Sequence, residues 1–365
     1  MDRYHARRDR LRATLKADGV DALFVTAATN VSYLTGFSGD SSVLLLGRAR
    51  DLIVSDGRFT TQLSQECPDL EAHIRLPGQE MNAALAQIMG AMGIGRAALE
   101  ATSWTIADFE GLREAAPTLA FVGLKGRVEA LRQIKDETEI AAIRQSIRYA
   151  ERAFAMLVAG LRDGESEKDV ADTLEGYLRR CGATGASFPP IVAVGVRSAL
   201  PHARPTSTTR IGQDDFVLVD WGATGHPYKS DLTRVLVTGN VTTTFETVYR
   251  TVLTAQERGI AAIRPGVKAH DVDAEARSVI EEAGFGRFFD HGLGHGLGMD
   301  IHEAPRLRKG SGTTLEPGMV ITVEPGVYLP DWGGIRIEDD VLVTPNGCEV
   351  LSHVAKSLDS VCIDT

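Results

Sequence analysis

DDFVLVDWG (residues 214–222) and GMVITVEPG (residues 318–326) follow one pattern, in which an apolar run leads to a carboxylate, one further residue and a glycine. Short runs rich in valine and isoleucine are typical of buried strands. The carboxylates are Asp220 and Glu324. A charge at the end of a buried strand is costly unless a partner compensates it. The repeated pattern therefore predicts two related halves, each of which carries an acid to the end of a strand.

Each half contains a second acid. Asp231 and Glu338 follow the first acids by 11 and 14 residues, and the tetrapeptide VLVT then recurs at 235–238 and 341–344. One such match could arise by chance. Two parallel half-motifs indicate that the four acids share one space.

Each acid also has a simpler interpretation when it is taken alone. Asp220 could cap a turn, as aspartate often does. Asp231 could pair with Arg234, and Glu338 with Arg336, because each arginine is close in the sequence. Four carboxylates in one space, however, cannot all stay ionised without a cation. A pair of divalent metal ions about 3.5–4 Å apart, bridged by carboxylates, meets that requirement.

The stretch HGLGHGLGMDIHE (291–303) places three histidines among glycines. A helix is not expected, because each glycine costs about 1 kcal/mol in a helix interior and Pro305 follows. The glycines allow unusual dihedral angles or a close approach of the backbone to a ligand. His295 would supply a nitrogen ligand, and His291 and His302 would face the substrate. An oxygen-rich set with one imidazole favours manganese or another first-row ion.

One further histidine lies in SALPHARP (198–205). His202 suits the binding of substrate, the stabilisation of an oxyanion and the movement of protons. The alternative is an ordinary loop histidine between two prolines. The same loop carries Arg197 shortly before it.

Composition excludes several classes of protein. The net charge of −10, with no basic tract, argues against a nucleic-acid partner. No apolar run approaches the ~18 residues that a membrane span requires, and the N-terminus lacks the apolar core of a signal peptide. Four scattered cysteines form no CxxC pair, which excludes a disulfide framework or zinc knuckle. We expect a soluble, cytoplasmic protein.

A length of 365 residues predicts roughly two domains. Helices and strands alternate over residues 1–126, which indicates a small α/β domain. Its expected helices are 3–18, 80–93 and 103–115, and its expected strands are 21–27, 41–47, 51–57 and 96–100, with a Gly/Ser-rich loop at 30–42. Residues 127–365 are expected to form an α+β domain. Its expected helices are a long one from Lys135, one after a capping Ser166, and those at 244–262 and 269–283.

The chain resembles the pita-bread metallopeptidases, which include methionine aminopeptidase, aminopeptidase P and prolidase. The matching pieces are VDWG, SDLTR, HGLGHGLGMDIHE, ITVEPG and GIRIED. NVSYLTGFSG and SDGRFTTQ are similar to the N-terminal domain of the Xaa-Pro branch, and SALPH is typical of that branch. The resemblance implies an α+β fold. A C-terminal pita-bread (creatinase/aminopeptidase-like) catalytic domain with an internal pseudo-two-fold would follow a smaller α/β creatinase/prolidase-like domain.

The resemblance also implies a role for each metal ligand. Asp220 would bind one ion, and His295 and Glu324 would bind the other. Asp231 and Glu338 would bridge the two. The ions would be two divalent metals, with manganese favoured and cobalt, zinc or iron as alternatives.

Other residues receive roles in substrate binding and catalysis from the same resemblance. His202 would support the scissile carbonyl and its tetrahedral intermediate, with His302 contacting the same region. His291 would line the proline pocket, and Arg336 would orient the ligands from behind. Glu324 would also relay a proton from the nucleophilic water.

The expected activity is metal-dependent hydrolysis of the bond between an N-terminal residue and a following proline, in a proline-containing peptide. Aminopeptidase P would accept longer peptides, and the length and the DGRF motif favour it slightly. Prolidase, the alternative, would hold the free carboxylate of a dipeptide with Arg197, Arg204 or Arg306. The same scaffold could also serve a hydrolase or lyase of a small non-peptide substrate, or a non-catalytic binding module.

The family implies a homodimer, in which TGFSGDSS (35–42) is a candidate loop that caps a partner's active site. A plain Gly/Ser turn is the alternative for that loop. Arg197 and Ala203 replace an asparagine and a glycine found in some relatives. Because these positions border the substrate, specificity transfers less directly than the metal site.

Overall fold

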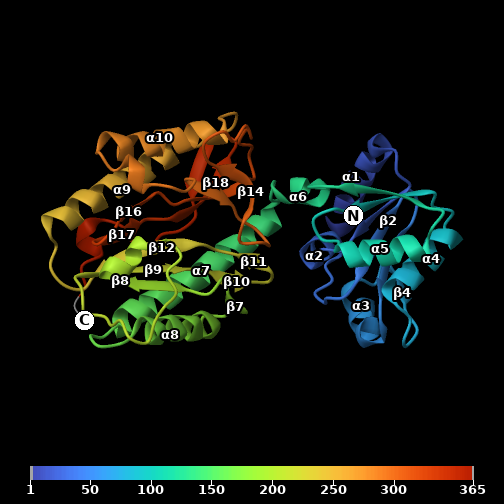
Figure 1. Ribbon diagram of the computed structural model, residues 1–365, viewed down its shortest axis with the longest axis horizontal. Coiled ribbons are helices and arrows are strands. Elements are labelled where there is room, and N and C mark those ends of the chain that lie inside the picture. Colours follow the sequence, from blue (N-terminus) through green and yellow to red (C-terminus); the bar gives the residue numbers. More distant parts are fainter. Residues whose placement is uncertain (1–2, 364–365) are drawn as a thin grey trace. The chain divides into compact units, whose positions relative to one another are not determined.

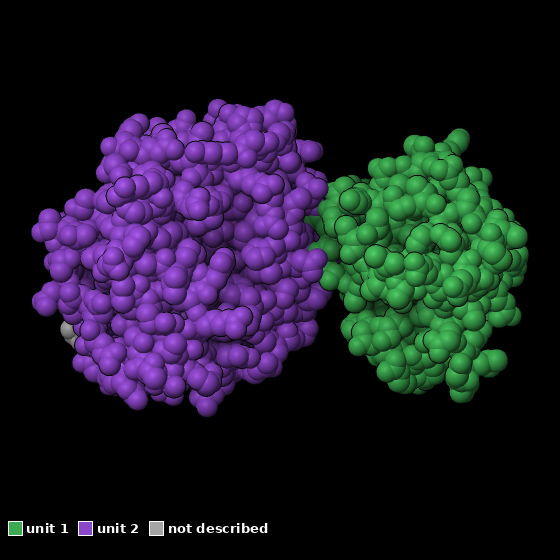
Figure 2. All heavy atoms as spheres, viewed as in Figure 1, with its two compact units in different colours: residues 1–132 green, residues 133–365 purple. Residues whose placement is uncertain are grey.

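The computed structural model describes residues 3–363. The chain divides into two compact units between Arg132 and Gln133 (Figure 2). Helix α6 (Arg127–Arg132) belongs to the first unit, so the division falls after this helix and not after Gly126. Every helix in residues 3–363 is too short or too polar to cross a membrane.

The first unit is built on one six-stranded sheet with the order β4-β3-β2-β1-β5-β6 (Figure 1). Strand β2 runs antiparallel to both neighbours, and the other pairs are parallel. Its strands are β1 (Ala22–Val25), β2 (Val43–Gly47), β3 (Asp51–Ser55), β4 (Glu71–Ile74), β5 (Arg96–Glu100) and β6 (Ala120–Leu124). Its other helices are α1 (Arg3–Asp18), α2 (Ala28–Thr35), α3 (Thr60–Glu66), α4 (Met81–Ala91) and α5 (Ile106–Ala115).

One expectation for this unit was wrong. Residues 30–35, expected as part of a Gly/Ser-rich loop, form most of helix α2. Val31 and Leu34 are buried there and the helix packs against α1, so packing outweighs the polar composition. The helix ends at Gly36, whose φ of 81° is the left-handed conformation that glycine adopts readily.

The second unit contains two halves of similar construction. In the first half, α7 (Glu137–Gly160) and α8 (Glu167–Arg180) accompany a sheet of order β12-β9-β8. In the second half, α9 (Thr243–Ala262) and α10 (Ala269–Glu282) accompany a sheet in which β18, β15 and β13 stand in the same order. Figure 1 shows each helix pair beside its own strands. The internal pseudo-two-fold expected from the repeated motifs is therefore confirmed.

The strands of the first half are β7 (Gly185–Ala186), β8 (Ile191–Val194), β9 (Phe216–Trp221), β10 (Ala223–Gly225), β11 (Tyr228–Lys229) and β12 (Leu232–Val237). Those of the second half are β13 (Gly294–Gly296), β14 (Glu303–Leu307), β15 (Val320–Val323), β16 (Gly326–Leu329), β17 (Gly333–Arg336), β18 (Asp339–Thr344) and β19 (Gly347–Val350). A bridge between Thr233 and Glu338 connects the halves.

Local sequence explains where the helices of this unit begin. Asp136 and Glu139 form a capping box at the start of α7, and Ser166 and Asp169 form another at the start of α8. The expected helices from Lys135, after Ser166, at 244–262 and at 269–283 are confirmed within a few residues. Their apolar faces pack on the strands, so both sheets have a buried core.

Candidate active site

The second unit encloses a cavity of about 710 Å³. All nine residues that the sequence singled out lie on its wall. They are His202, Asp220, Asp231, His291, His295, His302, Glu324, Arg336 and Glu338. The structure therefore brings the whole expected set together.

The four acids reach the cavity because strand ends meet there. Asp220 lies near the end of β9, and Asp231 immediately precedes β12, which pairs antiparallel with β9. Glu324 immediately follows β15, and Glu338 immediately precedes β18, which pairs antiparallel with β15. Each hairpin thus supplies two acids. Asp220, Asp231, Glu324 and Glu338 are called the acid cluster below.

His295 provides a nitrogen beside these oxygens. Its Nε2 lies 3.3 Å from Glu324 Oε1 and 3.6 Å from Asp231 Oδ2. Asp231, His295 and Glu338 each offer one atom, and these three atoms lie within 4.8 Å of one another. Two carboxylates and an imidazole at such spacing match the donor set of a first-row divalent metal ion.

Hydroxyl groups fix two of the carboxylates. Thr233 Oγ1 donates to Glu338 Oε2 at 2.6 Å, and Thr322 Oγ1 donates to Glu324 Oε1 at 3.0 Å. Thr233 lies two positions after Asp231, and Thr322 lies two positions before Glu324. Each threonine therefore points to the same side of the sheet as that acid. Both threonines were missed in the sequence, although this spacing in SDLTR and ITVE would have revealed them.

The local ion pairs that were the simpler alternative for Asp231 and Glu338 do not form. Arg234 pairs with Asp339 at 2.7 Å, and its side chain lies three positions from Asp231, on the opposite face of the strand. Arg336, at the end of β17, contacts Asp220 of β9 at 2.6 Å (Nη2 to Oδ2) and not Glu338, which lies beyond the end of β17.

Burial shapes the protonation of the acid cluster. It raises the pKa of Asp220 and raises the pKa of Glu324 to about 7. Burial, together with the charge of neighbouring acids, raises the pKa values of Asp231 and Glu338 well above the ordinary range. Asp220 Oδ1 is buried and has no hydrogen-bond partner among the described residues. The cluster therefore lacks the positive charge that four ionised carboxylates need.

The histidines of the cavity have distinct surroundings. Burial lowers the pKa of His295 to about 3 and that of His291 to about 4, so both are neutral at pH 7. His291 Nε2 lies 2.9 Å from the hydroxyl of Tyr328, and the same hydroxyl oxygen accepts from Arg336 Nη1 at 2.8 Å, while His291 Nδ1 faces the carbonyl of Gly292. Tyr328, missed in the sequence, thus links a cavity histidine to the arginine behind Asp220.

His302 packs edge-on against His295, with 4.4 Å between ring centroids, and burial lowers its pKa. His202 is exposed and lies on the loop that follows the turn at Gly195–Ala199. Both histidines are exposed and line the cavity, whereas His295 is buried among the acids.

The glycines around His295 serve close packing. A Cβ on Gly294 would lie 2.0 Å from Thr322 O, and one on Gly296 would lie 2.1 Å from Ala304 O. Neither residue has a positive φ. Of the two explanations offered by the sequence, unusual dihedral angles do not apply at these positions. Glycine is required because two neighbouring strands approach β13 closely.

Comparison with known proteins agrees with this geometry. The model of metallopeptidase family M24 matches residues 141–345, which include the entire acid cluster. The chain belongs to metallopeptidase family M24. The model of the creatinase/prolidase N-terminal domain matches residues 7–134. The expected family and fold, a pita-bread catalytic domain after an α/β domain, are confirmed, and the protein is a metallopeptidase.

Several M24 proteins are similar over their full length. An Xaa-Pro dipeptidase from Bacillus anthracis superposes with a TM-score of 0.95 at 36% identity, covering 99% of this chain and 100% of that one. An X-Pro aminopeptidase from Thermotoga maritima gives 0.89 at 35% identity, covering 98% and 100%. An Xaa-Pro dipeptidase from Pyrococcus horikoshii is 33% identical over 93% of this chain and 95% of its own.

Proposed function

We propose that this M24 protein is a dinuclear-metal Xaa-Pro peptidase that acts best on dipeptides. The observation that carries the proposal is a buried acid cluster without enough positive charge, facing a cavity whose wall also bears exposed arginines. Full-length similarity to Xaa-Pro dipeptidases and to an X-Pro aminopeptidase supports the substrate class. The acid cluster is compatible with both kinds of relative. The proposed preference for dipeptide substrates therefore rests on the arginines of the cavity wall.

The residues present fit a pair of divalent ions. The unpartnered Asp220 Oδ1 and the raised pKa values of the other acids both indicate a missing cation. In our proposal Asp220 would hold one ion, His295 and Glu324 would hold the other, and Asp231 and Glu338 would be shared by both. Oxygen-rich ligands favour manganese, with cobalt, zinc or iron as alternatives. Such a pair supplies a water of lowered pKa and polarises the scissile carbonyl.

The chain's own groups then complete the reaction. His202 and His302, accessible from the cavity, donate hydrogen bonds to the carbonyl oxygen as negative charge develops on it. Glu324, whose pKa is raised to about 7 by burial, suits the transfer of a proton from water to the leaving nitrogen. His291, held by Tyr328, lines the space for the proline ring.

Arg306 is the best-placed residue to hold the carboxylate of a dipeptide. It lies opposite His295 in the register between β13 and β14, and it is exposed on the cavity wall. Arg204 and Arg308 also line the cavity. Arg197, a third candidate from the sequence, is instead held by Glu167, since its Nε lies 2.9 Å from Oε1. A carboxylate clamp at Arg306 favours substrates that end at the proline.

The test compares Ala-Pro, Ala-Pro-Ala and alanyl-prolinamide, each with added manganese and again after chelation. We expect metal-dependent cleavage of Ala-Pro and much weaker cleavage of the other two. Arg306→Ala should raise KM for Ala-Pro at least about tenfold and leave KM for the amide nearly unchanged. Arg308→Ala is the matched control, with a smaller effect. Equal cleavage of the tripeptide would instead establish the aminopeptidase, and cleavage of none would refute the substrate class.

We further propose a cytoplasmic homodimer, as the family resemblance implies. The segment 35–42 is a candidate for contact with the partner's active site; its residues 38–41 include exposed polar side chains before β2. Light scattering of the purified chain measures the mass directly. A monomeric mass at assay concentration would refute the dimer.

A further inference from the structure

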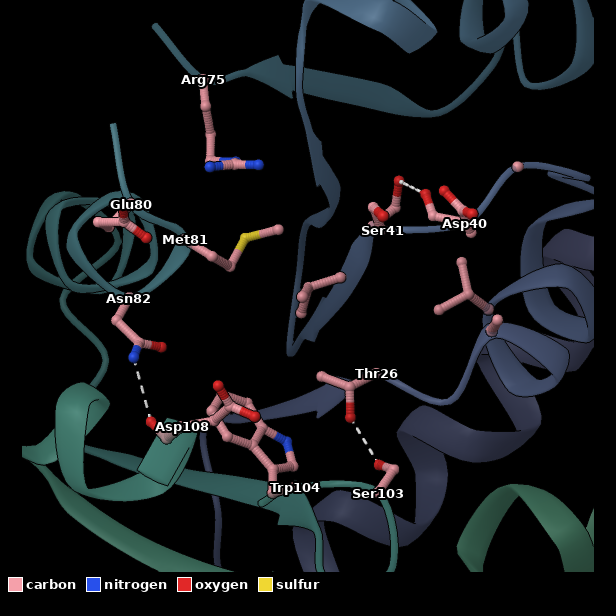
Figure 3. Close-up of a pocket in the computed structure, with 15 residues that line it drawn as sticks. Thr26, Asp40, Ser41, Arg75, Glu80, Met81, Asn82, Ser103, Trp104 and Asp108 are labelled. Carbon is pink, nitrogen blue, oxygen red and sulfur yellow. Dashed lines mark hydrogen bonds between the residues drawn. The ribbon is translucent and has the colours of Figure 1, made fainter. Parts of the chain in front are cut away.

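A second cavity lies in the first unit, at the carboxyl end of its parallel strands (Figure 3). It has a volume of about 420 Å³. Thr26 follows β1, Arg75 follows β4 and Ser103 follows β5, and all three line it. Residues 39–42, which lead into the antiparallel β2, close another side. Open α/β sheets bind their ligands at this edge.

The cavity also coincides with the point where the strand order reverses. From β1 the chain proceeds through β2 and β3 to β4 on one side of the sheet, and then returns to place β5 and β6 on the other. The segments that follow β1 and β5 therefore diverge, which leaves a crevice between them. The hydroxyls of Thr26 and Ser103, 2.6 Å apart, connect the two segments at its base.

Two buried donors in this cavity have no partner. Trp104 Nε1 and Arg75 Nε are shielded from solvent and make no hydrogen bond to any described residue. Figure 3 shows the two side chains on different sides of the hollow. The rest of the Arg75 guanidinium contacts Gln79 O at 2.5 Å and Asp56 at 3.5 Å, so the side chain is held in place. A buried donor left unpaired is costly, which indicates an acceptor supplied from outside the chain.

Helix α4 adds positive potential at the same place. Glu80 precedes the helix, and its side chain does not cap the free N–H groups. Met81 and Asn82, the first residues of the helix, line the cavity. The partial positive charge of the helix start thus reinforces Arg75.

The rim of the cavity has the opposite character. Asp40, Glu80 and Asp108 line the opening, and all three are exposed. Val31 and Val43 are buried apolar residues of the wall, and Met81 projects between the polar groups (Figure 3). A simple anion would meet repulsion at this rim. A ligand with a carboxylate at one end, an ammonium at the other and an apolar body matches all three features.

We propose that this cavity binds a free α-amino acid with an apolar side chain. The carboxylate accepts from Arg75, the ammonium faces the exposed acids, and the side chain packs on the valines and Met81. The proposal is independent of the peptidase activity, because every residue involved belongs to the first unit. Residues 39–42 also line the cavity, so the ligand would contact the segment that leads into β2.

The test is titration calorimetry of the full-length, chelated protein with L-leucine as probe. We expect saturable binding at one site. L-Leucinamide lacks the carboxylate, N-acetyl-L-leucine lacks the ammonium, and glycine lacks the apolar body, so each should bind at least about tenfold more weakly. Equal binding of the amide, or no binding of leucine up to its solubility, would overturn the proposal.

Two variants locate the site. Arg75→Gln removes the charge that the carboxylate needs and should weaken leucine binding at least about tenfold; Trp104→Phe keeps the ring but removes a donor on another side of the hollow, and should weaken binding less. Trp332→Phe and Arg113→Gln are matched controls outside the cavity and should bind as the wild type does. Near-ultraviolet circular dichroism checks that all four remain folded.

A further variant separates this site from the peptidase cavity. Glu338→Gln alters the acid cluster and should leave leucine binding unchanged. Binding that survives in Trp104→Phe and Arg75→Gln but disappears in Glu338→Gln would place the leucine in the other cavity and refute the proposal. That result would leave the peptidase function untouched.

Discussion

Glu338 and Asp339 are adjacent in the chain, are both buried, and have opposite electrostatic surroundings. Asp339 belongs to a closed cluster, in which Arg234 and Lys356 pair with it at 2.7 and 2.6 Å and Gln256 and Ser352 donate to it at 2.8 Å. Burial alone would raise its pKa, yet the two cations lower it below the ordinary value.

Glu338 belongs to the acid cluster and faces the other side of the same strand region. Burial and its acidic neighbours raise its pKa well above the ordinary value, and the Thr233 hydroxyl is its nearest stabilising partner. The protein therefore supplies two cations to the single carboxylate of Asp339, whereas the four carboxylates of the acid cluster share one, Arg336, which pairs with Asp220. Each prediction below tests this difference.

The largest effect is expected from Glu338→Gln. The variant removes a proposed bridging ligand while keeping the shape of the side chain, so activity on Ala-Pro should fall at least about a thousandfold. The metal-free form should be no less stable than the wild type, because a repelled charge is removed. Activity assays and thermal unfolding after chelation measure the two effects. Retention of activity within tenfold would show that Glu338 is no ligand.

Asp339→Asn should do the reverse. It leaves Arg234 and Lys356 buried beside a neutral group, and breaking a buried pair in this way costs about 3–5 kcal/mol. Denaturant unfolding of the chelated protein measures the loss. The fraction that remains folded should still bind manganese. A variant as stable as the wild type but devoid of metal binding would contradict the assignment of Asp339 to stability.

The pH dependence of the metal-free protein should reveal the acid cluster. Raised pKa values mean that the folded state holds more protons than the unfolded state, so stability falls as pH rises, through about 7 for Glu324. His291 and His295, whose pKa values are lowered in the folded state, change the stability only below about pH 6.5, where these imidazoles become protonated in the unfolded state.

Above pH 6.5 the free energy of unfolding of the chelated protein should therefore decline by about 1.4 kcal/mol per pH unit for each carboxyl that is protonated in the folded state and ionised in the unfolded state, and the contribution of Glu324 should end near pH 7. Asp339 does not contribute there, because its pKa is lowered and it is ionised in both states. The manganese-loaded protein should lack the decline. An equal slope with and without metal would refute this account.

The smallest effects are expected from single hydroxyls on the two clusters. Thr233→Val removes the donor to Glu338 and should weaken manganese binding about 10–100-fold with little change in stability of the metal-free form. Ser352→Ala removes a donor to Asp339 and should cost about 1 kcal/mol of stability without affecting metal affinity. Metal titration and denaturant unfolding of both variants provide the comparison. If both variants lost manganese affinity and stability to the same extent, the distinction between the two clusters would be refuted.

Much of this arrangement could be predicted from the sequence because it depends on strand ends. The apolar runs before Asp220 and Glu324 define strands, and antiparallel pairing of neighbouring strands brings Asp231 and Glu338 to the same edge. The histidine-rich stretch avoids a helix, as its glycines required. Local pattern was sufficient for these features.

The partners of the arginines could not be predicted in the same way. Arg234 pairs with Asp339, more than a hundred residues away, and Arg336 pairs with Asp220. These contacts depend on how the two halves pack, which no local spacing encodes. Tyr328 was missed for a different reason, because its hydroxyl gains a role only when the β16–β17 hairpin and the segment before β13 bring Arg336 and His291 to it.

The bridge between Thr233 and Glu338, where the two halves meet, has a consequence for the ancestry of the molecule. A symmetric dimer of two identical half-chains, related by the two-fold axis that approximately relates the halves here, would already bring four carboxylates together. Only duplication within one chain permits the halves to diverge. β13 brings His295 to the wall of the cavity, whereas β8, its counterpart beside β9, brings Ile191. The single imidazole is thus a departure from symmetry that a dimer of equal halves could not have made.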